Sequence, residues 1–441
     1  MIRLSVMHMR INLKRRPNSI DLPRLLERID SKVDVIPFIT MKYLSQKQEA
    51  SNKNSTEFQE KYGITFRDYE LLTNIIKKQE AKEDSCLSDV KSALNVLKNS
   101  SNEDIKEIFS RVDEEKITKE IFDDIVEILE SEDDLKKLFK QVNYVQYAIK
   151  NEDNKRIIPP TVKLLSNLAS TNRKTNNVYD PSSIDAQTIT ELDDFNHATI
   201  HIKDEEDYYH AKQNIILSDI SPDKVSMCND EILIDEDDKK YDTIISVPYP
   251  KQKIKNENIE RYAEYESKNP KLIHLLNMID HLDSDGLLVT TTTQGLLVKK
   301  DALKLRKYLI DNNLLDVVIE YESGYRSRDI TILVINNNKK TDDFLFIKPP
   351  EMFPTFLLPA FNENILEIYK ERKIESRLSN IINKDEIIKN EYNLNPKRYV
   401  YTLDYKKVAV DDILKNQREY SDEIKKLDDE IDDMLSMLTD L

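Results

Sequence analysis

Between residues 178 and 347 the sequence alternates between short apolar segments and longer amphipathic ones, and this alternation constrains the fold most strongly. Apolar runs rich in β-branched residues predict strands, whereas apolar residues three or four positions apart predict helices. The expected strands are 178–180, 198–203, 224–228, 241–247, 286–291, 315–320, 329–336 and 343–347, and the expected helices are 205–217, 257–281 and 299–313. Strands separated by such helices favour an α/β fold with a doubly wound sheet and crossover helices.

The regions on either side of this alternation have different patterns. Residues 1–150 are predicted to form a helical N-terminal domain, because apolar residues recur at helical spacing from Leu22 onward. Asn102 and Thr118 each precede an acidic first turn and are expected to start helices. The alternating domain is placed at 151–350, an irregular, proline-marked region at 351–408, and a C-terminal helix at 409–441.

The C-terminal segment carries an apolar stripe with the alternating spacing of four and three residues that is typical of a coiled coil. Gln417 fills one seam position, and the other positions are mostly Lys, Asp and Glu; the stripe consists of Ile413, Tyr420, Ile424, Leu427, Ile431, Met434, Leu438 and Leu441. A single helix of this kind exposes its seam to water, so we expect a partner. A second chain is favoured over a hairpin within this chain because the helix is terminal and strictly patterned.

Charge and composition exclude several classes of function. A net charge of −16 means that the chain as a whole does not attract nucleic acid, so any DNA contact needs a local basic patch or a basic partner. The two cysteines, Cys86 and Cys228, are too few and too far apart for a disulfide framework or a cysteine-rich zinc site, and no metal site is expected. With no signal peptide and no run long enough to span a membrane, the protein is predicted to be cytoplasmic.

Glycine is scarce, and its positions matter. The chain has four glycines, whereas ordinary usage would give roughly thirty. None lies between Pro160 and Pro250, where a cofactor loop of the α/β domain would fall. Such loops use glycine where the backbone must approach a ligand closely or take a positive φ. A base composition that depletes glycine throughout the chain explains the scarcity, but it explains the complete absence from this stretch less well.

Several segments resemble, in the right order, the modification (HsdM-type) subunit of type I restriction–modification systems. Tyr241-Asp-Thr-Ile-Ile-Ser-Val-Pro-Tyr-Pro250 is similar to the strand and catalytic loop of N6-adenine DNA methyltransferases, in which (Asn/Asp)-Pro-Pro-(Phe/Tyr) follows the strand. Val178-Tyr-Asp-Pro-Ser-Ser-Ile-Asp185 is similar to the family's cofactor loop, VYDPACGTG. Ile36–Ser45 resembles a helix of the first domain, and Leu394–Val400 a segment before the C-terminal coil.

The resemblance implies a class I, Rossmann-like methyltransferase domain that uses S-adenosylmethionine. It implies that Asp180 and Pro181 belong to the cofactor loop, that Asp204 contacts the ribose hydroxyls, and that Asp230 lies near the cofactor adenine. It also implies a specificity (HsdS-type) subunit as a partner through the C-terminal coil, and double-stranded DNA as a ligand of the complex.

The departures from the family pattern fall on the chemistry. Val247 stands where Asn or Asp accepts hydrogen bonds from the adenine amine, and valine has no acceptor. Pro248 is retained, Tyr249 replaces the second proline and Pro250 replaces the aromatic residue, so no catalytic residue is intact. The loop glycines are replaced, with Ser183 and Asp185 or their neighbours in their places. We therefore expect no cofactor, or only weak binding of S-adenosylmethionine.

Three functions are compatible with this sequence. The favoured one is a non-catalytic methyltransferase-like scaffold in a DNA-targeting restriction–modification or phage-defence complex. The second is an active but divergent N6-adenine methyltransferase, with Ser246 or Tyr249 as the amine acceptor. The third is an acidic inhibitor that imitates DNA or blocks the specificity subunit. Methyl transfer to DNA separates the second from the first, and competition with active modification subunits identifies the third.

Overall fold

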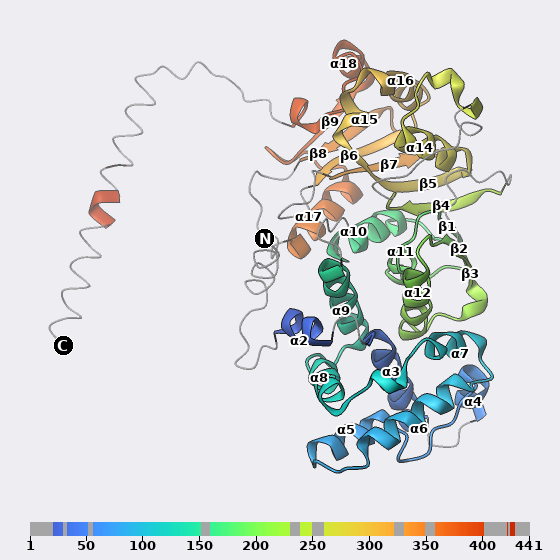
Figure 1. Ribbon diagram of the computed structural model, residues 1–441. Coiled ribbons are helices and arrows are strands. Elements are labelled where there is room, and N and C mark those ends of the chain that lie inside the picture. Colours follow the sequence, from blue (N-terminus) through green and yellow to red (C-terminus); the bar gives the residue numbers. More distant parts are fainter. Residues whose placement is uncertain are drawn as a thin grey trace. The chain divides into compact units, whose positions relative to one another are not determined.

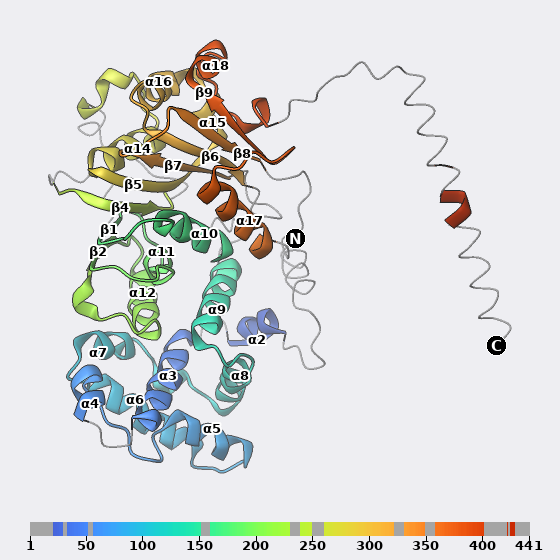
Figure 2. The ribbon, with the colours of Figure 1, turned by 180° about the vertical axis from the view of Figure 1, so that it is seen from behind.

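The computed structural model describes residues 21–29, 33–51, 56–150, 159–229, 239–248, 260–321, 330–348, 358–400, 421 and 424–427. The chain divides into a unit of Met1–Val400 and a second unit of Tyr401–Leu441. None of the described helices combines the length and the apolarity needed to cross a membrane. Figures 1 and 2 show the chain from two opposite sides.

The first part of the larger unit is helical, as predicted. Its helices are α2 (Leu22–Ile29), α3 (Ile36–Ala50), α4 (Thr56–Tyr62), α5 (Leu72–Glu80), α6 (Cys86–Lys98), α7 (Glu103–Ser110), α8 (Lys119–Leu129) and α9 (Leu135–Lys150). The side chains of Asn102 and Thr118 accept hydrogen bonds from the backbone amides of Ile105 and Ile121, so both predicted helix starts are confirmed. The apolar faces of these helices form one core.

The strands form one sheet in the order β3-β2-β1-β4-β5-β7-β6-β8-β9 across the described residues. Their bounds are β1 (Asn177–Asp180), β2 (His197–His201), β3 (Val225–Cys228), β4 (Tyr241–Ser246), β5 (Leu282–Thr293), β6 (Leu315–Tyr321), β7 (Ile330–Asn336), β8 (Asp343–Ile347) and β9 (Ser379–Asn383). The pairs from β3 through β5 are parallel, β7 is antiparallel to both its neighbours, and β6 is parallel to β8. The predicted α/β class is therefore confirmed.

Helices cover both faces of this sheet (Figures 1 and 2). One apolar core includes residues of α10 (Pro159–Ser170), α11 (Gln187–Thr190), α12 (Glu205–Leu217) and α17 (Leu358–Glu371). The other includes residues of α14 (Pro270–Asp280), α15 (Gln294–Val298), α16 (Leu303–Asp311) and α18 (Lys384–Lys389). Neighbouring strand residues alternate between the two cores, as Ile244 and Ile245 of β4 do.

Two expectations about regular structure were wrong in detail. The helix expected at 257–281 is interrupted: residues 260 and 261 are helical, but α14 begins only at Pro270, because Asn269 caps it and proline suits the first helical position. The segment 351–408 was expected to be irregular, but residues 358–400 contain α17, α18 and β9, and β9 pairs with β8 at the edge of the sheet. Strand β9 reads Ser-Asn-Ile-Ile-Asn, which is too short and polar to give a clear strand signal.

Helix α12 joins the helical part to the sheet. Its residues Ile216 and Leu217 belong to the core of the helical part, while Ala211 and Ile215 belong to the core under the sheet. Thr40 of α3 donates a buried hydrogen bond of 2.9 Å to Gln213 of the same helix. The helical part therefore shares a packed interface with the α/β part, and the predicted bounds of the four domains stay predictions.

Candidate functional site

The candidate site lies where β1 and β4 end side by side. The two strands are parallel neighbours, with Tyr179 paired to Ile244, so Asp180-Pro181 and Val247-Pro248 follow at the same edge of the sheet. The strand order reverses between β1 and β4, and open α/β sheets bind ligands at the carboxyl ends of the strands at such a point. The structure thus brings together two of the segments that the sequence singled out.

Asp180 is fully buried at the end of β1. Its carboxylate accepts hydrogen bonds from the backbone amide of Ser182, at 3.1 Å, and from the hydroxyl of Thr188. Burial raises the pKa of Asp180 to about 6, although these hydrogen bonds favour the charged form and act in the opposite direction. The carboxylate is directed into its own turn, which makes it a structural group of the loop.

Val247 closes the same corner from the β4 side. It is only 9% exposed, and it lines a cavity of about 30 Å³ together with Asp180 and Thr188. Beside it, the hydroxyls of Ser246 and Ser182 share a buried hydrogen bond of 2.6 Å. A drug-sized ligand needs roughly 300–1,000 Å³, whereas this cavity has room for about one water molecule. The described residues around it include two carboxylates, Asp180 and Asp185, and neither lysine nor arginine.

The loop after β1 has one residue in the left-handed region, Ala186, with φ of 60°. Matched to VYDPACGTG from Val178 onward, the two glycine positions fall on Ile184 and Ala186, the neighbours of Asp185. A positive φ is a conformation that favours glycine. The backbone therefore keeps the turn that a glycine would make there, while side chains occupy the space that glycines would leave open.

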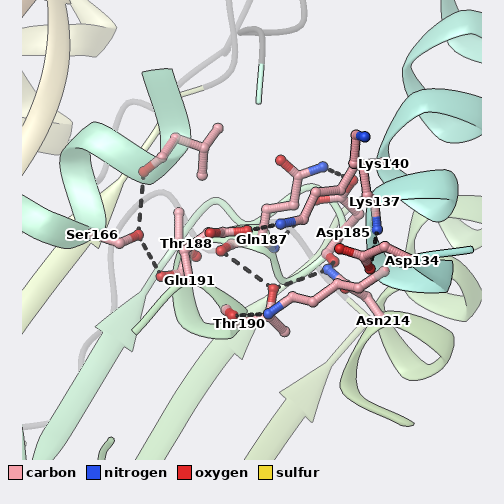
Figure 3. A network of polar contacts seen from close by, with 12 residues as sticks. Asp134, Lys137, Lys140, Ser166, Asp185, Gln187, Thr188, Thr190, Glu191 and Asn214 are labelled. Carbon is pink, nitrogen blue, oxygen red and sulfur yellow. Dashed lines mark hydrogen bonds and ion pairs between the residues drawn. The ribbon is translucent and has the colours of Figure 1, made fainter. Parts of the chain in front are cut away.

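Helix α9 holds this loop from the helical part of the chain (Figure 3). Asn143 donates a buried hydrogen bond of 2.6 Å to the carboxylate of Asp185, which also accepts one of 2.9 Å from the side chain of Gln187. Lys140 forms an ion pair with Glu191, and Lys136 donates to the carbonyl oxygen of Thr190 at 2.5 Å.

Helices α10 and α12 also contact this loop through hydrogen bonds. Ser166 of α10 donates to the carbonyl oxygen of Thr188 at 2.7 Å. Asn214 of α12 donates to the carbonyl oxygen of Asp185 at 2.9 Å and to the hydroxyl of Thr190 at 3.1 Å. Three helices therefore fix the loop through its own polar groups, as the labelled residues in Figure 3 show.

Asp204 lies at the start of α12, away from this cavity. Its carboxylate caps the helix by accepting hydrogen bonds from the backbone amides of Glu206 and Asp207, at 2.9 and 3.2 Å. Asp230, Tyr249 and Pro250 lie outside the described residues. The roles of Asp180, Pro181, Asp204 and Asp230 toward a cofactor stay predictions.

Some residues that shape this site had no signal in the sequence. Asn143, Gln187 and Asn214 are ordinary polar residues of helical segments, and no local pattern marks them as contacts of the cofactor loop. Among the residues that the structure describes, no group of His, Cys, Asp and Glu is arranged to hold a metal ion. His197 and His201 stand at the two ends of β2, so they do not form a helical pair.

The C-terminal stripe is described at two positions. Ile424 and Leu427 lie in a helical segment of the second unit, and their exposed fractions are 59% and 54%. The predicted seam residues Ile413, Tyr420, Ile431, Met434 and Leu438 lie outside the described residues. The coiled coil stays a prediction, and the exposure of these two apolar side chains is compatible with it.

Residues 155–408 match the N-6 DNA Methylase family. The type I restriction enzyme MpnII methylase subunit of Mycoplasma pneumoniae is 26% identical over 174 residues, which cover 35% of this chain and 32% of that relative. The match thus spans about a third of the relative's length.

Two solved structures have the same fold. The type I restriction-modification system methyltransferase subunit from Streptococcus thermophilus gives a TM-score of 0.69 at 16% identity, covering 88% of this chain and 100% of that one. A modification subunit assigned to a type I restriction enzyme from Vibrio vulnificus YJ016 gives 0.55 at 12% identity, covering 88% and 92%. The resemblance predicted from the sequence is confirmed, and so is the class I methyltransferase fold.

Proposed function

The chain belongs to the N-6 DNA Methylase family, and from that premise we propose that it is a non-catalytic, methyltransferase-fold subunit. It acts as a scaffold in a DNA-targeting complex of the restriction–modification or phage-defence type. The observation that supports this proposal is the small space at the ends of β1 and β4, where Val247 and the loop after β1 leave a cavity of about 30 Å³.

The missing acceptor is the first support for an inactive site. Methyl transfer to an adenine amine needs acceptors placed on that amine while its nitrogen attacks the methyl group of the cofactor. Val247 supplies none from its side chain. Ser246 is the nearest described hydroxyl in the sequence, but it is fully buried and already shares a hydrogen bond with Ser182.

The occupied loop is the second support. The methionine part of the cofactor carries a carboxylate, and Asp180 and Asp185 place two more carboxylates around the remaining space. Asp185 is held by Asn143 and Gln187, so moving it away would break buried hydrogen bonds to a charged group. These contacts support a loop that keeps its carboxylates where the methionine part of the cofactor would lie.

Methyl incorporation into DNA tests the inactive site directly. The chain is assayed with its cognate specificity subunit, tritiated S-adenosylmethionine and DNA, and an active modification subunit with its own partner serves as the positive control. We expect no incorporation above background, both for the natural chain and for Val247→Asn, because an acceptor alone does not open the cavity. Robust methyl incorporation by the natural chain would support the alternative of a divergent enzyme, and it would reject the proposal that the chain is a non-catalytic scaffold.

The partner is proposed to dock on the C-terminal stripe. Exposed apolar side chains at Ile424 and Leu427 support a seam that another chain covers. The variant Leu427→Asp/Met434→Asp is expected to lose co-purification with the specificity subunit, because two charges would be buried in an apolar interface.

A matched control keeps the charge but moves it off the stripe. Ser421→Asp/Ser436→Asp adds the same two carboxylates to the same segment at positions outside the seam. This control is expected to assemble like the natural chain. If the stripe variant also assembles, or if both variants fail, the seam is not the docking element.

A further inference from the structure

A second hollow lies at the opposite, amino edge of the sheet. Its walls come from segments that lead into strands: Lys239 and Lys240 precede β4, His281 precedes β5, and Leu314 precedes β6. Asn337, which follows the antiparallel strand β7, lies at this edge as well. The pocket has a volume of about 620 Å³, which is within the usual range for a ligand site.

The charge of this pocket is opposite to that of the chain. Its described lining contains three cations, Lys239, Lys240 and Arg261, against one carboxylate, Asp280. The whole chain carries a net charge of −16, so a basic hollow is a local exception. The three cations come from two separate segments, and the pocket gathers them beside the hydroxyls of Ser284 and Tyr308.

Asp280 contacts two of these cations. Its carbonyl oxygen accepts a hydrogen bond from the ammonium group of Lys240. Its carboxylate accepts a hydrogen bond of 2.7 Å from the hydroxyl of Tyr262 and lies 3.8 Å from the guanidinium of Arg261, at the outer limit of an ion pair. Among the described residues, the lining thus places three cations and two hydroxyl groups around the same space as this one carboxylate.

We propose that this pocket binds the phosphate groups of a nucleotide, supplied either by a free nucleotide or by the backbone of DNA. Arginine and lysine together with hydroxyl donors suit a phosphate, because its oxygens are acceptors only and carry the charge that the cations neutralise. The pocket is large enough for a nucleotide and is shallow and polar enough for a stretch of DNA backbone. We expect an affinity of roughly 10⁻⁴–10⁻⁶ M, as for non-specific DNA binding.

Binding assays with two probes test the proposal on the full-length chain, without any partner subunit or methyl donor. A fluorescent 20-base-pair duplex is titrated by anisotropy over a range of salt concentrations, and ATP is titrated by calorimetry. The test variant is Lys239→Gln/Lys240→Gln/Arg261→Gln. The control is Lys77→Gln/Lys106→Gln/Lys119→Gln, which removes three exposed cations from the helical part.

The test variant is expected to bind at least one probe about tenfold more weakly or worse. For the duplex, the slope of log affinity against log salt should fall by about 2–3 in magnitude, because each lost phosphate contact removes about 0.9. Loss for the duplex alone identifies the DNA backbone as the source, loss for ATP alone identifies free nucleotide, and loss for both means that either is accepted.

Three outcomes overturn the proposal: the natural chain binds neither probe, the test variant binds both as the natural chain does, or the control loses as much affinity as the test variant. Thermal midpoints within a degree or two of the natural chain show that the variants are folded. Because the assay involves neither methyl transfer nor a specificity subunit, its result is independent of the proposed scaffold role.

Discussion

The two edges of one sheet differ in the space and charge that their described residues offer. At the carboxyl edge, where ligands of open α/β sheets normally bind, the described residues at the ends of β1 and β4 line a cavity of about 30 Å³, and two of the lining residues are carboxylates. At the amino edge, a pocket of about 620 Å³ collects three cations. The strands that connect the edges keep the order and direction of the fold, so the difference lies in the loops alone.

The sheet and the loop after β1 are stabilised by different kinds of contact. The sheet is packed between two apolar cores, one on each face, and Ala186 and Val247 belong to one of them. The loop after β1 is stabilised by α9, α10 and α12, through protein groups. A loop held in this way does not need a cofactor to be ordered.

The largest expected effect comes from the buried carboxylate at the closed edge. The pKa of Asp180 in the folded chain is about 6, above its ordinary value of 3.8, so the folded state binds the proton more tightly. Protonated Asp180 therefore contributes about 3 kcal/mol to the free energy of unfolding below pH 4, and this contribution is lost as the pH rises to 6. Asp180→Asn removes this loss.

The measurement is urea unfolding of both proteins between pH 4 and 7. The free energy of unfolding of Asp180→Asn relative to the natural chain should rise with pH over this window and level off above pH 6. A difference that is independent of pH means that the carboxylate is not buried in the folded chain.

The next-largest effect is expected when the hydrogen bond from Asn143 of α9 to Asp185 is removed. Asn143→Ala removes a donor from the buried carboxylate of Asp185, and hydrogen bonds to charged groups contribute about 1.5–3 kcal/mol. We expect a loss of about 2 kcal/mol in the free energy of unfolding. Gln141→Ala, at a half-buried position of the same helix, is the control and is expected to cost less. Equal losses for the two variants would show that the hydrogen bond from Asn143 to Asp185 adds no stability of its own.

A smaller effect of opposite sign is expected at Ala186, the residue of this loop with a positive φ. Ala186 has a φ of 60°, which costs an alanine roughly 1–2 kcal/mol and a glycine little. Most of this gain is offset by the greater freedom of glycine in the unfolded chain and by the loss of a methyl group that is fully buried in the apolar core. Ala186→Gly should therefore stabilise the protein by at most about 0.5 kcal/mol in the same urea measurement, and a loss of about 2 kcal/mol or more contradicts the left-handed conformation.

The smallest effect on stability is expected at the amino edge. Lys239→Gln/Lys240→Gln changes two exposed side chains, and surface substitutions of this kind usually stay within about 0.5 kcal/mol. Urea unfolding of this variant should match that of the natural chain, even though its affinity for phosphate falls. A loss as large as that of Asn143→Ala would mean that the amino-edge lysines are structural, which removes the contrast between the edges.

Strands that are buried on both faces could be predicted from the sequence because their apolar runs are continuous. The residues of β4, β6 and β8 fell almost where the alternation placed them, whereas the polar edge strand β9 gave no such run. The helix starts at Asn102 and Thr118 were readable because capping is local.

The two edges themselves were less predictable. The sequence assigned Asp180 to the cofactor loop and Val247 to the catalytic loop, because each lies at the end of an expected strand and resembles a family segment. It did not show that Asn143 reaches Asp185, because the two residues lie 42 positions apart and neither belongs to a pattern. The amino-edge pocket was equally hidden, since Lys239, Arg261 and Tyr308 meet only after the chain has passed through β4 and β5.

Titration of the full-length chain with S-adenosylmethionine in a calorimeter tests the central claim most directly. The closed carboxyl edge predicts no heat of binding, or only weak binding, with the ligand in large excess, both at pH 7 and at pH 5, where Asp180 is mostly protonated. Tight binding at micromolar concentration, lost in Asp180→Asn or after substitution of Asp204, would contradict the account and restore the carboxyl edge as a working cofactor site.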